Sequence, residues 1–150
     1  MTATHFSGPV MTGTKQAGET NGPNMGYTVL QQTVTLAQDG TNAVSATAYL
    51  PPGSKIIDII VDVLTAFNSA TSAVLSVGET AGGTEYASSV NAKTAGRTRP
   101  TFTAAQLAAM NNMTVLGVAD PTPAPVVTTI TPTGATTAGF VEVTVLYAQL

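Results

Sequence analysis

The chain has 150 residues, a formal net charge of −3 and charged side chains at only 9% of its positions, against roughly 25% in an ordinary soluble domain. The absence of cysteine excludes disulfides, cysteine nucleophiles and iron–sulfur clusters. A mildly acidic chain without a run of Lys or Arg is a poor binder of nucleic acid. No apolar stretch approaches the roughly 20 residues of a membrane span. We therefore expect neither nucleic acid nor a membrane as a partner.

The first 26 residues differ in composition from the rest of the chain, with five glycines, two prolines and few large apolar residues. We expect residues 1–26 to form an extended arm with little packing of its own, and residues 27–150 to form one domain. Two interpretations of the arm remain open. It is either a disordered tail or an arm that a partner surface orders, with Phe6, Val10 and Met11 as its anchors.

After the arm, short runs rich in Val, Ile, Thr and Leu alternate with turn signals such as Asp39-Gly40 and Pro51-Pro52-Gly53. Asp-Gly favours a tight turn, and consecutive prolines cannot continue a ladder of strands. This pattern predicts an all-β fold, an antiparallel β-sandwich or jelly roll of about eight strands. The predicted strands cover residues 27–36, 43–50, 56–65, 73–77, 85–90, 115–118, 126–130 and 140–148.

The clearest predicted strand is 56–65. Strict alternation places Asp58 and Asp62 on one face, which is only partly wet because three apolar side chains share it. The opposite face, which we expect to be buried, carries Ile57, Ile59, Val61 and Val63.

One segment departs from the β pattern. Thr103 and Gln106 form a T-x-x-Q capping box ahead of Leu107, Ala108, Ala109 and Met110, and such a box marks the start of a helix. We predict one short helix, closed by Asn111-Asn112.

The search for a catalytic constellation is negative. The single histidine, His5, lies in the predicted arm, whereas a catalytic triad needs a rigidly held base. Asp58 and Asp62 share a strand face, but the rise of a β-strand separates them by roughly 13 Å, which is too far to share one ion or one proton. Glu79 and Glu85 flank a Gly-Gly turn, yet two carboxylates are too few for calcium, which takes six or more oxygens. We expect no enzyme activity, no metal and no cofactor.

Arg97 and Arg99, which follow Lys93, form the only basic cluster of the sequence. One interpretation is a solvated loop. The other is contact with an acidic surface of a partner, because arginine makes bidentate pairs with carboxylates.

The low charge is accompanied by 27 threonines, so much of the surface must be weakly polar. A monomer normally keeps more charge outside for solubility. Charged residues are depleted at the cores of protein interfaces. The composition therefore favours a component of an assembly.

Four segments, 4–14, 50–68, 76–86 and 139–147, together resemble the small capsid decoration proteins of tailed bacteriophages, also called cement or head-stabilising proteins. The likeness spans nearly the whole chain. It implies an all-β domain, often a homotrimer, bound to the outer surface of the capsid at junctions between major capsid proteins, without catalysis.

This resemblance leads to the hypothesis that the chain is a virion protein which stabilises the phage head, with residues 5–11 of the arm at the contact. Two alternatives stay open. The first is another virion β-module, such as a head-fibre base, a tail module or a baseplate module. The second is a carbohydrate-binding adhesive domain, which the absence of tryptophan disfavours.

Overall fold

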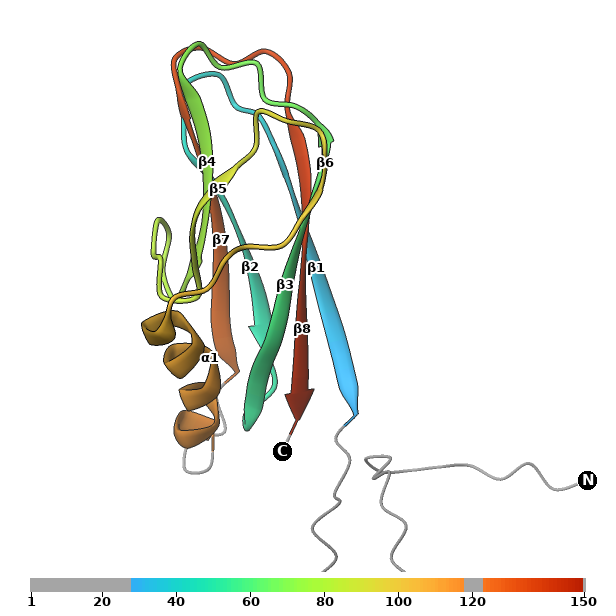
Figure 1. Cartoon of the computed structure of the whole chain (residues 1–150), viewed down its shortest axis with the longest axis vertical. Helices are drawn as coiled ribbons and strands as arrows, with labels where there is room; N and C mark the ends of the chain where they lie inside the picture. Colours follow the sequence, from blue (N-terminus) through green and yellow to red (C-terminus); the bar gives the residue numbers. More distant parts are fainter. Residues whose placement is uncertain (1–27, 118–122, 150) are drawn as a thin grey trace, which may run out of the picture.

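The computed structural model describes residues 28–117 and 123–149, which form a sandwich of two four-stranded antiparallel sheets with one helix (Figure 1). The arm predicted over 1–26, with Phe6, Val10 and Met11, lies outside the described residues. The first sheet has the order β1-β8-β3-β6 and the second the order β2-β7-β4-β5. The strands are β1 (Val29–Ala37), β2 (Val44–Leu50), β3 (Ser54–Thr65), β4 (Ser72–Gly78), β5 (Ala87–Asn91), β6 (Gly96–Thr98), β7 (Ala124–Thr133) and β8 (Phe140–Gln149).

The first strand pairs with the last, the second with the seventh, and so on inwards, as in one long β-hairpin that is folded over into two sheets. β1 pairs with β8, β2 with β7, β3 with β6 and β4 with β5, all antiparallel. β8 also pairs with β3, which joins β1-β8 and β3-β6 into one sheet, and β7 also pairs with β4, which joins β2-β7 and β4-β5 into the other. This is the connectivity of a jelly roll, so the predicted all-β fold is confirmed.

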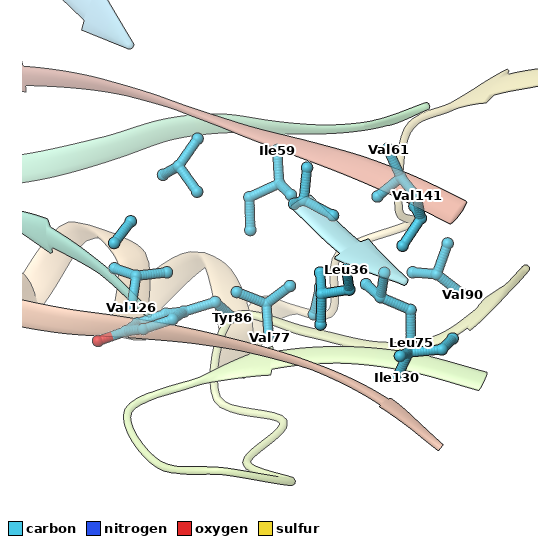
Figure 2. Packing of buried hydrophobic residues seen from close by; sticks show 14 of the residues in the cluster. Leu36, Ile59, Val61, Leu75, Val77, Tyr86, Val90, Val126, Ile130 and Val141 are labelled. Atoms are coloured by element: carbon cyan, nitrogen blue, oxygen red, sulfur yellow. The ribbon is translucent and has the colours of Figure 1, made fainter. Parts of the chain in front are cut away.

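The core lies between the two sheets and is built from alternate residues of nearly every strand (Figure 2). In β8, Val141, Val143 and Val145 are fully buried, while the residues between them are partly exposed. Burial of one such side chain stabilises the fold by about 1.5–3 kcal/mol. The predicted half-buried pattern of the last strand is therefore confirmed.

β3 contradicts the strict alternation expected of it. Its pairing with β8 shifts register between Ile56 and Asp58, and again between Val63 and Thr65. A β-bulge adds one residue to one strand and so reverses the alternation beyond it. Ile56 therefore joins Ile59 in the core, and Ile57, which was predicted to be buried, is 46% exposed.

The helix α1 (Ala104–Gly117) begins where the capping box predicts. The Thr103 amide donates to Gln106 Oε1 at 2.9 Å, and the Gln106 amide donates to Thr103 Oγ1 at 3.2 Å. Gln106 Nε2 also donates to the Thr84 carbonyl at 3.0 Å, which ties the helix to the β4–β5 connection. Met110 reaches the core.

The predicted end of the helix and the strand predicted over 115–118 are wrong. The helix runs through Asn111 to Gly117, because asparagine is only a mildly unfavourable helix residue while glycine favours termination. The eighth strand is instead β6, whose Gly-Arg-Thr sequence has no apolar alternation by which to recognise it.

Candidate protein-interaction surfaces

Charge is distributed unequally between the two sheets. The strands of the β2-β7-β4-β5 sheet contain no Asp, Glu, Lys or Arg. In the β1-β8-β3-β6 sheet, charged side chains occur on β3, β6 and β8 but not on β1. Among the strands, charged side chains are thus confined to β3, β6 and β8, which leaves one whole sheet and the edge strand β1 without charge.

The outer face of the uncharged sheet carries mainly hydroxyl groups. Ser45 Oγ and Thr129 Oγ1 lie 2.8 Å apart between β2 and β7, and Ser72 Oγ donates to Thr133 Oγ1 at 2.9 Å between β4 and β7. The hydroxyls bond to one another and need no ionic partner. This face is therefore compatible with burial against another protein, since charge is what interface cores avoid.

The connection between β4 and β5 folds onto this face. The Gly82 amide donates to Thr129 Oγ1 at 2.8 Å, and Thr129 is buried although its side chain lies on the outer side. Within the connection, the Glu79 amide donates to Glu85 Oε2 at 3.2 Å. The two glutamates that flank the Gly-Gly turn are thus linked by a hydrogen bond from the backbone of one to the side chain of the other.

Tyr86 adds to this connection from the core side. Its hydroxyl donates to Glu79 Oε1 at 3.3 Å, and the residue is 1% exposed. Burial raises the pKa of the Tyr86 phenol far above its usual range, and the neighbouring carboxylates of Glu79 and Glu85 raise it further. The phenol therefore stays neutral and acts as a hydrogen-bond donor rather than as a base.

The two arginines of the basic cluster lie beside two aspartates of β3, an arrangement that the sequence did not predict. Arg97 Nε and Nη2 donate to the two carboxylate oxygens of Asp62 at 2.7 and 2.8 Å. Arg99 Nε lies 3.2 Å from Asp58 Oδ2. The Arg97 pair forms because Asp62 and Arg97 are register partners of β3 and β6. The two arginine side chains remain 70% and 68% exposed, and so stay accessible.

The Asp62–Arg97 pair predicts a measurable pH dependence. The bidentate hydrogen bond from Arg97 lowers the pKa of Asp62 below its usual value of 3.8. Ionised Asp62 therefore contributes stability at pH above 3.8, and that contribution is lost as the pH falls through the lowered value. Arg97→Gln is expected to return the carboxyl titration of Asp62, followed by NMR, towards 3.8. Arg99→Gln is the control, and an equal shift in both variants would contradict the assignment.

Apolar side chains are exposed at several places outside these polar networks. Two of them, Ile57 and Leu64, are the residues that have no partner on β8 at the register shifts of β3. Three others, Val29 and Leu30 of β1 and Tyr49 of β2, belong to edge strands of the two sheets. These two strands are joined by a hydrogen bond from Gln32 Nε2 of β1 to the Tyr49 carbonyl of β2 at 2.7 Å.

Two further kinds of site, a metal centre and a membrane-spanning helix, have no candidate among the described residues. They contain no group of three or more His, Cys, Asp or Glu side chains that could hold a metal ion. No helix among them is long and apolar enough to cross a membrane.

Comparison with known proteins finds a structural neighbour but no sequence relative. No family model matches the chain, and no curated protein matches it. A solved structure described as the cyanophage Pam1 capsid asymmetric unit contains a chain that matches with a TM-score of 0.50 and 21% identity. The match covers 95% of this chain and 99% of that chain. It shows that the same fold occurs, over the whole length, in a phage capsid.

Proposed function

We propose that this protein is a structural component of a phage virion, a decoration protein that binds the outside of the head between major capsid proteins and stabilises the shell. The observation that carries the proposal is the end-to-end match to a chain from a cyanophage capsid. The sequence resemblance to head-stabilising proteins points the same way. A ligand that binds the assembled shell but not its free subunits stabilises the shell by mass action.

The distribution of charge supports a role in an assembly. The strands of the β2-β7-β4-β5 sheet carry no charged side chain, so the part of its outer face that the β4–β5 connection leaves uncovered can be buried without desolvating ions, and desolvation of unpaired charge is a large cost at an interface. We propose that the arm of residues 5–11 adds to this contact through Phe6, Val10 and Met11. Arg97 and Arg99 are the further candidates for contacts to the capsid or between subunits, because their side chains are exposed while their orientation is set by Asp62 and Asp58.

Binding to heads tests the proposal directly. Purified protein is expected to co-sediment with heads that lack it, at a saturating ratio set by the lattice, and to raise the temperature at which those heads release DNA. Homotrimers would strengthen weak contacts through effective concentration, and a molar-mass measurement in solution tests that part. Localisation in the tail, or glycan binding by the isolated protein without head binding, would contradict the proposal in favour of the two alternatives.

Deletion of residues 1–12 tests the arm separately. We expect the truncated protein to keep the sandwich, because the eight strands between residues 29 and 149 supply the packed core between the two sheets, but to occupy fewer sites on heads. The matched variant replaces Phe6, Val10 and Met11 together by serine in the full-length chain. Unchanged occupancy in both would refute the arm contact while leaving the decoration role intact.

A further inference from the structure

The four edge strands of the two sheets differ in how well they are protected. β6 has three residues and carries the paired Arg97. β5 has five residues, pairs with β4 through a register shift and contains Ser89 at a φ of 59°. On β2, the carbonyl oxygen of Tyr49 already accepts a hydrogen bond from the side chain of Gln32. Short strands, charges and bulges are the means by which proteins keep edges from pairing with other chains.

β1 has none of these protections. It has nine residues, contains no charge, proline or glycine, and pairs with β8 in unbroken register along its whole length. Its other edge has no strand partner in the described sheets. A long, regular, uncharged edge of this kind is a template for strand addition.

The sequence of β1, VLQQTVTLA, is nearly symmetric in polarity about Thr33. If two copies of β1 were antiparallel with Thr33 opposite Thr33, apolar residues would face apolar residues and polar would face polar in every pair except that of Gln32 with Val34. Cross-strand pairs of matched character stabilise a sheet, and like charges in such a pair destabilise it. The pairs would be Val29–Ala37, Leu30–Leu36, Gln31–Thr35 and Gln32–Val34.

The same pairing would cover the apolar side chains that are exposed at the start of β1. Val29 is 51% and Leu30 is 40% exposed, whereas Leu36, which would face Leu30 of the other copy, is 1% exposed. Leu30 of each copy would thus extend the other copy's core. Absence of charge matters here because residues near a two-fold axis meet their own copies.

We propose that β1 pairs antiparallel with β1 of a second copy about a two-fold axis at Thr33, joining two β1-β8-β3-β6 sheets into one sheet of eight strands. This contact does not depend on the decoration role, because it is formed between copies of the isolated chain. On a shell it would link neighbouring decoration units to one another.

Single cysteines test the register, since the chain has no cysteine of its own. Directly opposed residues lie about 4.5–5.5 Å apart between Cα atoms, within the range that a disulfide spans. Thr33 is exposed. The Thr33→Cys variant is therefore expected to form covalent dimers on mild oxidation. Val29→Cys alone is the control, because its two copies would lie about 27 Å apart. Val29→Cys mixed with Ala37→Cys is expected to give the mixed dimer.

Charge at the axis provides the second test. Thr33→Lys places two ammonium groups opposite each other and is expected to lower association, measured as molar mass against concentration. Thr65→Lys, at an exposed position at the end of β3, is the matched control and should associate like the original protein. Circular dichroism and thermal unfolding establish that both variants are folded.

Two outcomes would overturn the proposal. One is a protein that stays monomeric at every concentration, or associates without forming the Thr33→Cys dimer. The other is a Thr33→Cys dimer that forms only after residues 1–12 are deleted, which would mean that the arm, and not a second β1, occupies this edge in the full-length chain. Dimers that persist in the deletion variant would support β1 pairing, whatever the result of the head-binding experiment.

Discussion

Gly139→Ala is expected to destabilise the protein by about 3 kcal/mol, the sum of backbone strain and an overpacked contact. Gly139 is buried immediately before β8 and has a φ of +156°. A Cβ at this position would lie 2.5 Å from Cγ and Cδ1 of Phe67. Phe67 is itself 1% exposed, so the ring has no free space to enter.

The backbone around this contact cannot easily yield either. Asn68 Oδ1 accepts hydrogen bonds from the Thr137 and Ala138 amides at 2.9 and 3.1 Å, and the Asn68 amide donates to the Ala138 carbonyl at 3.2 Å. These bonds hold the segment that carries Phe67 against the segment that carries Gly139. Strain at this site is therefore expected to weaken the whole sandwich rather than one loop.

Urea unfolding measures the effect, with Gly96→Ala as the control. Gly96 has a φ of +134°, and no atom lies within 4 Å of the position that a Cβ would take there, so alanine at this site carries backbone strain without a clash. The difference between the two variants isolates the contact with Phe67. Equal destabilisation by both substitutions would contradict the packing argument, and Phe67→Leu in the Gly139→Ala background is expected to restore part of the loss.

Thr128→Val and Thr129→Val are expected to change stability in opposite directions, although the residues are neighbours on β7. Thr128 lies on the core side and is fully buried, and its hydroxyl has no hydrogen-bond partner among the described residues. Replacing that hydroxyl with a methyl group removes a desolvated polar atom without changing the shape of the side chain. The expected gain is about 1 kcal/mol.

Thr129 presents the opposite situation on the outer side of the same strand. Its Oγ1 accepts from the Gly82 amide at 2.8 Å and lies 2.8 Å from Ser45 Oγ. Valine would leave that amide without its acceptor, with an expected cost of about 1–3 kcal/mol. The shift of the urea midpoint at constant slope measures both effects. Two shifts of the same sign would contradict the assignment of partners.

For the charged residues, composition predicts that weakly charged surfaces exist but not where they lie in the fold. The scarcity of ionic side chains indicates surfaces suited to burial, without saying where those surfaces lie. The jelly-roll connectivity then gathers four uncharged strands from separate parts of the chain into one sheet. Likewise, nothing in the spacing of Asp58, Asp62, Arg97 and Arg99 predicts their pairing, which depends on β6 lying beside β3.

Local signals predicted what depends on neighbours in the sequence. The capping box of Thr103 and Gln106, the half-buried alternation of β8 and the turns between most strands are read correctly because a few adjacent residues determine them. The bulge at Ile57 and the short strand β6 were missed, because each is decided by the strand opposite. The open edge of β1 is likewise a property of the sheet, since an edge exists only once the order of the strands is known.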